Sequence, residues 1–163
     1  MILTCFSGSC TVEGVLPQCS GPDWYEFGDF CYKPFGDKKT WHNARSSCRN
    51  LGADLVSIHL KCEVFSFAAT SNVWTGLNDL AIPGLFMWSD EHIVTFTYWA
   101  PGEPNNHNGF SEDCVEMLHQ TGRWNDKSCT QLNNYVCKIF TVGNEKRSVD
   151  LMFHYFLRWG QGR

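Results

Sequence analysis

The sequence lacks the features that mark several common classes of function. Charged residues make up only 18% of its 163 residues, the formal net charge is −4, and no basic stretch stands out. This composition argues against nucleic acid as the main partner. The motifs Gly-x-Ser-x-Gly and His-Glu-x-x-His are absent, as is a Gly-rich loop that could bind phosphate. These absences favour a binding protein over an enzyme.

Two further absences concern metals and membranes. The sequence has no Cys-x-x-Cys pair followed by closely spaced histidines, so a zinc site has little support. No apolar run approaches the roughly 18 to 20 residues that a membrane-spanning helix needs, and we expect no membrane insertion by the chain itself. The first residues carry no basic segment and only a short apolar run, so they are not interpreted as a signal peptide.

Cysteine, in contrast, is abundant. Nine cysteines in a chain of this length are far more than cytosolic proteins usually contain and indicate disulfide formation in an oxidising compartment. We therefore expect an extracellular or cell-surface location. The odd number leaves at least one thiol without a partner. Seven tryptophans add large rings that can fill a compact core without long helices.

Composition divides the chain into three parts. Residues 1–18 are rich in Cys, Gly and Ser without periodicity, and we interpret them as a linker or a fragment of a neighbouring module. Residues 19–138 carry the regular patterns of one domain. In residues 139–163, Asp150, His154 and Arg158 would line one face of an otherwise apolar helix. We interpret this extension as weakly packed or non-native, with a membrane-surface or partner helix as the alternative.

Local patterns in the central part predict an α+β domain. Aromatic and polar residues alternate over residues 19–31, which predicts a short hairpin. A helix follows between its N-cap Thr40 and Gly52. Its buried positions, at helical spacing, are Trp41, Ala44, Cys48 and Leu51.

A second, shorter helix is predicted over residues 61–70, with apolar residues on one side. Strands are predicted over residues 53–58, 73–79, 85–90, 112–117 and 133–139. Two helices that precede most of the strands indicate an α+β arrangement. The residues that we assign to the core by their size are Trp74, Trp88, Trp99 and Trp124.

Six cysteines can pair in a nested way, although the sequence alone does not fix the connectivity. The pairs are Cys19 with Cys31, Cys48 with Cys137, and Cys114 with Cys129. Chain-entropy arguments give each such bridge roughly 3 to 5 kcal/mol of stability. Three further cysteines have no assigned partner, namely Cys5, Cys10 and Cys62.

The segment "EPNNHNGFSEDCVEM", Glu103–Met117, gathers acids and amides in a loop that ends in a Cys-bearing strand. Together with "WTGLND", "WND" and "YVCK", in that order within this cysteine framework, it resembles a C-type lectin domain. The stretches "GADLVSI", "WSD" and "FTYWAPGEPNN" make the chain most similar to the repeated domains of the mannose receptor family of endocytic receptors. The resemblance covers about residues 19–138. It implies a double-loop α+β fold, with two helices packed on small antiparallel sheets that disulfides staple together.

The resemblance also implies a calcium cofactor and its ligands. Calcium takes six to eight oxygen ligands and tolerates irregular geometry, so carboxylates and amide carbonyls on loops suit it. The residues that match the family's sugar-binding calcium site are Glu103, Asn105, Glu112, Asn125 and Asp126. The same five side chains would contact the carbohydrate. His107 would pack on the sugar ring, with a solvated loop histidine as the alternative reading, and Pro104 is expected to be cis.

Chemistry supports this implied function. A carboxylate only accepts hydrogen bonds, whereas an amide whose carbonyl faces a metal still donates through its NH2 group. Such a set matches two adjacent sugar hydroxyls. In the family, the order Glu-Pro-Asn accompanies equatorial 3- and 4-hydroxyls, so the resemblance implies mannose-type glycans, including N-acetylglucosamine and fucose. The expected role is a recognition domain of a larger endocytic or cell-surface receptor that binds glycans or glycoproteins.

The sequence departs from the family pattern at several positions. The span from Glu103 to Glu112 is one residue longer, and the segment 59–72 is shorter than the usual second helix. Of an auxiliary calcium site, three residues match, but Pro83 stands where an acid is expected, so we do not predict a second ion. The shortened helix and the unpaired cysteine favour one alternative function, a lectin-like module that binds protein ligands without sugar.

Overall fold

The structure is a computed structural model that describes residues 2–6, 9–13, 19, 21–61, 71–107 and 111–140. Near the N-terminus, β1 (Ile2–Phe6) and β2 (Ser9–Glu13) pair antiparallel as a separate two-stranded hairpin. The other described elements are β3 (Tyr25–Phe27), β4 (Phe30–Lys39), α1 (Trp41–Arg49), β5 (Asp54–Leu55), β6 (Val73–Asn78), β7 (Met87–Trp88), β8 (Cys114–Met117), β9 (Trp124–Lys127) and β10 (Asn133–Phe140).

These later strands form one sheet in the order β3-β4-β10-β6-β8-β9, with β5 beside β10 and β7 beside β6. The pairing of β10 with β6 is parallel, and the other pairings are antiparallel. The prediction of small antiparallel sheets, which the family resemblance implied, is therefore wrong, because these strands form one mixed sheet. A parallel pair needs a long crossover connection, and short-range patterns in the sequence contain no signal for such a pairing.

The structure confirms the first predicted helix. The Thr40 hydroxyl accepts a hydrogen bond from the backbone amide of Asn43, and the buried residues of α1 are Trp41, Ala44 and Cys48. Leu51 is 47% exposed, so its assignment to the buried stripe was wrong. The helix ends at Arg49, and Gly52 follows with φ +73°, a conformation that favours glycine.

The part of the chain that the structure describes contains one helix, not the expected two. The second was predicted over residues 61–70, of which 62–70 lie outside the described residues. The strand predicted over residues 53–58 is reduced to β5, although the Val56 amide still donates to Val136 and its carbonyl accepts from Gly76. The strand β9 was not predicted, because "WND" was interpreted as a core tryptophan that positions two site residues and not as part of a strand.

The core consists of two adjoining clusters of buried side chains. One lies around Trp88 and Trp124, and the other lies between α1 and the neighbouring strands, around Trp41 and Trp74. The buried indoles of the second cluster satisfy their N–H groups with backbone carbonyls, since Trp41 Nε1 donates to Thr75 and Trp74 Nε1 to Lys39, both at 2.8 Å. The core assignment of the tryptophans is confirmed, with Trp99 partly buried against the first cluster.

The three disulfides of the predicted framework are present: Cys19–Cys31, Cys48–Cys137 and Cys114–Cys129. Cys48–Cys137 joins α1 to β10, and Cys114–Cys129 joins β8 to the turn after β9. Cys62 and the side chains of Cys5 and Cys10 lie outside the described part of the chain.

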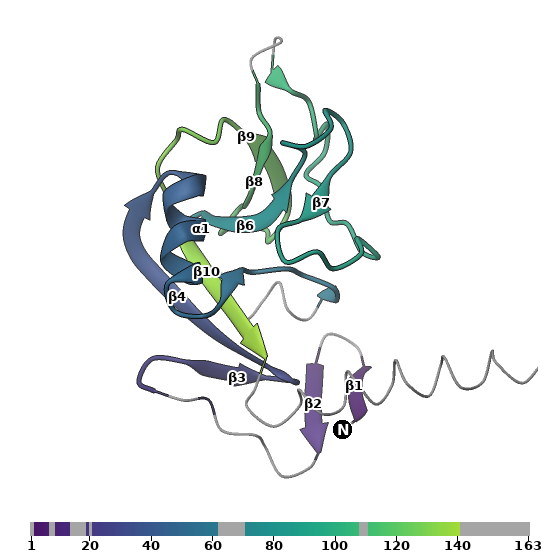
Figure 1. Cartoon of the computed structure of the whole chain (residues 1–163). Helices are drawn as coiled ribbons and strands as arrows, with labels where there is room; N and C mark the ends of the chain where they lie inside the picture. The colour runs from purple at the N-terminus through teal and green to yellow at the C-terminus, as the bar shows by residue number, and fades with distance from the viewer. Residues whose placement is uncertain are drawn as a thin grey trace, which may run out of the picture.

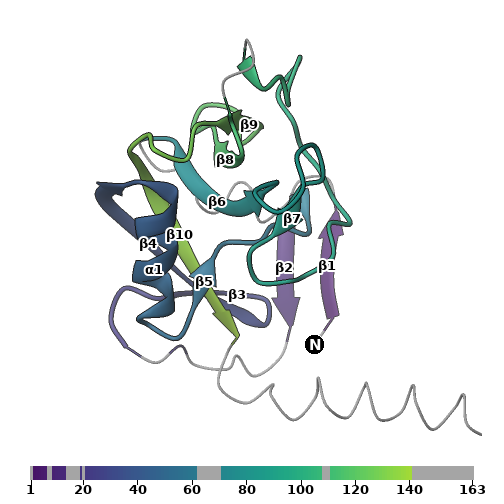
Figure 2. The same cartoon turned by 45° about the horizontal axis from the view of Figure 1, so that its top comes forward.

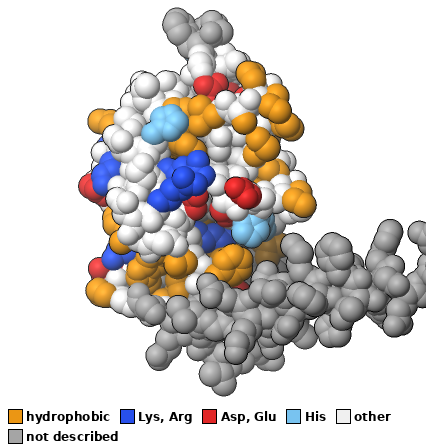
Figure 3. Space-filling view, in the orientation of Figure 1, with side chains coloured by type: hydrophobic (Ala, Val, Ile, Leu, Met, Phe, Trp, Pro, Cys, Tyr) orange, Lys and Arg blue, Asp and Glu red, His pale blue; other side chains and the backbone are white. Residues whose placement is uncertain are grey.

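Figures 1 and 2 show the arrangement of these elements. In both views, residues 103–107 and 111–113 lie toward the end of the molecule opposite to β3 and to the C-terminal end of β10. On the face drawn in Figure 3, basic and acidic side chains are interspersed rather than gathered by sign. Asp54 forms ion pairs with both Arg45 and Arg49. No described helix is long and apolar enough to cross a membrane.

Candidate metal and carbohydrate site

The base of the acid-rich loop is tied to the first residue of β9. The Ala100 amide donates to the Trp124 carbonyl, and the Trp124 amide donates to the Tyr98 carbonyl, both at 2.8 Å. The Trp124 ring is fully buried and meets Trp88 and Trp99 edge to face. The core thus fixes the start of β9, and Asp126, two residues after Trp124, contacts the loop.

Asp126 forms the main link between β9 and the loop. Its carboxylate accepts hydrogen bonds from the backbone amides of Asn105, at 3.1 Å to each oxygen, and of Asn106, at 2.7 Å. The residue is 2% exposed. The Glu103–Pro104 peptide bond just before these amides is cis, as expected. The structure therefore brings Asp126 against the Glu-Pro-Asn segment, although the two are far apart in the sequence.

Glu103 lies in the same cluster. Its Oε1 accepts a hydrogen bond of 2.9 Å from Asn105 Nδ2, and its Oε2 is buried without a partner among the described residues. Burial raises the pKa of the Glu103 carboxyl above its usual range, and the neighbouring Asp126 carboxyl and the charge of Glu112 raise it further. A cation beside Glu103 would oppose this rise, because its positive charge favours the ionised form of the Glu103 carboxyl.

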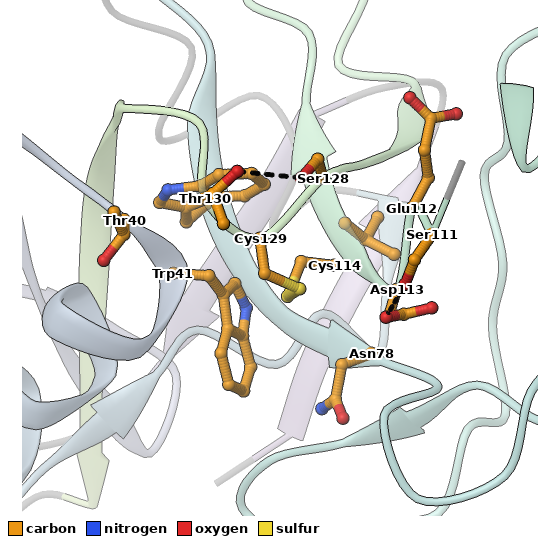
Figure 4. The surroundings of a disulfide bond; sticks show 12 residues. Thr40, Trp41, Asn78, Ser111, Glu112, Asp113, Cys114, Ser128, Cys129 and Thr130 are labelled. Atoms are coloured by element: carbon orange, nitrogen blue, oxygen red, sulfur yellow. Dashed lines mark hydrogen bonds between the residues drawn. A yellow bond between two sulfur atoms is a disulfide. The ribbon is translucent and has the colours of Figure 1, made fainter.

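Glu112 reaches the cluster through backbone contacts. Its Oε2 accepts from the His107 amide at 2.8 Å, and its own amide donates to Asn106 Oδ1 at 3.1 Å. Figure 4 shows the Glu112 side chain extending away from the Cys114–Cys129 disulfide. Residues 108–110, which complete this turn, lie outside the described residues.

Asn125 is the fifth predicted ligand, and its side-chain amide forms a hydrogen bond with Glu116 in β8. Asn125 Nδ2 donates to Glu116 Oε1 at 3.1 Å. Sequence reasoning missed Glu116, which was read as an ordinary residue of a predicted strand. A signal was available, because Glu116 is an acid between two apolar residues, Val115 and Met117.

The stacking of His107 on a sugar and the binding of a metal ion both remain predictions. His107 is exposed, and its hydrogen bond to Glu112 uses only the backbone, so its stacking on a sugar remains a prediction. Among the described residues, no three His, Cys, Asp or Glu side chains lie close enough to hold a metal ion by themselves. A cation here would need the amide oxygens of Asn105 and Asn125 as well, and calcium accepts such oxygens.

Comparisons with known proteins identify the class of this domain. Residues 37–139 match the family model of the lectin C-type domain. C-type mannose receptor 2 of Homo sapiens is 39% identical over 129 residues, which cover 76% of this chain but only 9% of that receptor. This chain therefore belongs to the C-type lectin family, whose domains are non-enzymatic binding domains.

Solved structures agree with this assignment. The carbohydrate-recognition domain of cow CD23, solved in the presence of a GlcNAc2Man3 oligosaccharide, is 36% identical with a TM-score of 0.71, over 77% of this chain and 98% of that one. The C-type lectin CEL-I from Cucumaria echinata is 34% identical with a TM-score of 0.70, over 76% and 99% of the two chains. The chain has the fold of a C-type carbohydrate-recognition domain. Domains of this kind typically bind carbohydrates and are typically extracellular.

Proposed function

We propose that this chain binds mannose-type glycans through a calcium ion held by Glu103, Asn105, Glu112, Asn125 and Asp126. The observation that carries the proposal is the cluster in which Asp126 binds the backbone of the Glu-Pro-Asn segment and a buried oxygen of Glu103 has no hydrogen-bond partner within the described part of the chain. The proposed ligands include mannose, N-acetylglucosamine and fucose. The CD23 domain, solved with an oligosaccharide that contains mannose and N-acetylglucosamine, supports this ligand class.

The side chains of this chain supply the polarity that a pair of hydroxyls requires. Bound calcium would coordinate two adjacent sugar hydroxyls. Glu103 can accept a hydrogen bond from one hydroxyl, because a carboxylate only accepts. Asn105 uses one N–H of its amide on Glu103 Oε1, which leaves its second N–H to donate to a sugar oxygen. Glu112 and Asn125 would provide the corresponding acceptor and donor for the other hydroxyl.

A single site of this kind binds weakly. We expect a monosaccharide dissociation constant of about 1 mM, or roughly −4 kcal/mol, because a sugar held at an exposed loop buries little surface. Useful avidity then requires several domains or clustered ligands. This suits a recognition domain within a larger cell-surface or endocytic receptor, and the similarity to part of a mannose receptor supports that setting.

Retention on mannan beads tests the proposal. The chain should be retained with calcium and released by a chelator. The double variant Glu103→Gln with Asn105→Asp should lose mannose binding and gain galactose binding, because it exchanges acceptor and donor positions around the diol. The matched control is Glu91→Gln, which neutralises an exposed acid away from the cluster and should bind mannan normally.

Retention that is unchanged by chelator would contradict the proposal. A glycan array in calcium and again in chelator would then show whether the chain binds any sugar. Protein binding that is unaffected by the double variant would favour the alternative, a lectin-like module for protein ligands.

A further inference from the structure

Glu116 is a buried carboxylate in β8 that the family resemblance did not point to. The residue is 2% exposed, and a buried charge is costly unless hydrogen bonds compensate it. Four donors surround it: Asn133 Nδ2 at 2.6 Å and Asn72 Nδ2 at 3.2 Å on Oε2, and Asn125 Nδ2 and Lys127 Nζ, both at 3.1 Å, on Oε1. Each carboxylate oxygen therefore accepts two hydrogen bonds.

The two oxygens of Glu116 serve different parts of the domain. Oε2 binds amides from β10 and from the residue just before β6. Oε1 binds two residues of β9, and one of them, Asn125, lies directly opposite Glu116 in the register of β8 and β9. Lys127 Nζ is the second donor to Oε1, at 3.1 Å, and a lysine ammonium can only donate.

This contact fixes the orientation of the Asn125 amide. Oε1 acts as an acceptor, since it also accepts from the Lys127 ammonium, so Asn125 binds it through its NH2 group. The carbonyl oxygen Oδ1 must then point away from Glu116, and the second N–H stays available. Without the carboxylate, the amide could rotate by about half a turn and exchange the two atoms, because its terminal torsion is soft.

We infer that Glu116 is a positioning residue for the proposed site, and this inference rests on the proposed function. Glu116 holds the Asn125 amide so that Oδ1 faces a divalent cation and the free N–H faces a sugar hydroxyl. It touches neither ligand. Residues that orient metal ligands in this way commonly change metal affinity about 10- to 100-fold when they are replaced.

The variant Glu116→Met tests the inference. Methionine has a similar length but no strong hydrogen-bond acceptor, so the side-chain NH2 group of Asn125 loses the partner that orients it. The Asn125 amide could then rotate, and its oxygen would no longer be held in place as a ligand. We expect calcium to bind about 10- to 100-fold more weakly in a calorimetric titration.

Two further variants separate positioning from a general loss of structure. Asn133→Ala removes a donor from the other oxygen of Glu116, so it should lower the melting temperature while the calcium affinity stays within about twofold. In an Asn125→Ala background, Glu116→Met should have no further effect on calcium affinity, because the group that Glu116 positions is gone. An equal loss of affinity in Asn133→Ala, or an additive loss in the double variant, overturns the inference.

A further measurement uses the unaltered chain in the absence of calcium. In chelator, one side-chain N–H signal of Asn125 should exchange slowly with solvent in NMR spectra, while the other exchanges fast. Two equally fast signals would contradict the inference. If the unaltered chain binds no calcium, the proposed function fails and the inference fails with it. If the chain binds calcium and Glu116→Met binds it equally well, only the inference fails.

Discussion

The region around α1, β4 and β10 and the acid-rich loop beside β9 are stabilised by different interactions. In the first region, buried rings and the Cys48–Cys137 disulfide join elements that are distant in the sequence. In the second, the contacts that set the shape of the loop are hydrogen bonds between carboxylates and backbone amides. Packing in the first region is independent of charge, whereas the loop is built from groups that a cation or a proton would change. Stability and binding can therefore be altered separately.

The largest expected effect is a loss of stability when the disulfide of the first region is removed. Replacing Cys48 and Cys137 together by Ala should lower the free energy of unfolding by roughly 4 to 5 kcal/mol, because the bridge closes a loop with a sequence separation of 89. Chemical denaturation checks this. Removal of Cys19 and Cys31 is the comparison, with roughly 3 kcal/mol expected for a separation of 12 residues. An equal loss from both removals would show that loop length does not set the difference.

Removing the contact between Asp126 and the acid-rich loop should weaken calcium binding far more than it lowers stability. In Asp126→Ala the amides of Asn105 and Asn106 lose their acceptor, but both residues are exposed, so water can replace it. We expect a loss of about 1 to 2 kcal/mol in chelator, together with loss of calcium binding. Denaturation and calcium titration measure the two effects, and Glu91→Ala is the matched control. Normal calcium binding by Asp126→Ala would remove Asp126 from the ligand set.

Acidification should release the glycan while the first region, around α1, β4 and β10, stays folded. Calcium ligands must be ionised, and burial followed by the neighbouring Asp126 carboxyl raises the pKa of Glu103 in the cation-free chain. Protons therefore compete with calcium at a higher pH than at an ordinary glutamate. Mannan retention should fall between about pH 7 and 5, with an unchanged near-ultraviolet circular dichroism spectrum. Flat retention across this range would contradict the prediction.

The smallest effect should come from an exposed charge pair in the first region. A hydrogen bond from Lys39 lowers the pKa of Asp37, so its stabilisation is present above the usual aspartate pKa and is lost as the pH falls through the folded value. Solvent screens this pair, and Asp37→Asn should have only a small effect on stability at neutral pH. Chemical denaturation of Asp37→Asn and of the unaltered chain, at neutral pH and in strong acid, measures the difference in stability. This difference should vanish in acid. A large effect would give electrostatics a role in this region.

Much of the first region follows from local patterns in the sequence. Thr40, the helical spacing of Trp41, Ala44 and Cys48, and the final Gly52 define α1, because capping and burial on one face act within a few residues. The strands predicted over residues 73–79, 112–117 and 133–139 are confirmed as β6, β8 and β10, because strand patterns also act within a few residues. The disulfide pairs were proposed from the framework but could not be chosen by sequence alone, since pairing depends on distance in space.

The sequence by itself determined the residue types of the candidate site: acids and amides in two short segments, within a cysteine-rich domain of the C-type lectin family. Only the tertiary structure decided that Asp126 binds the backbone of Asn105 and Asn106, that β10 runs parallel to β6, and that Glu116 faces Asn125. The reason is physical. These contacts join segments that come together only when the core closes, and no pattern within one segment encodes the register between two.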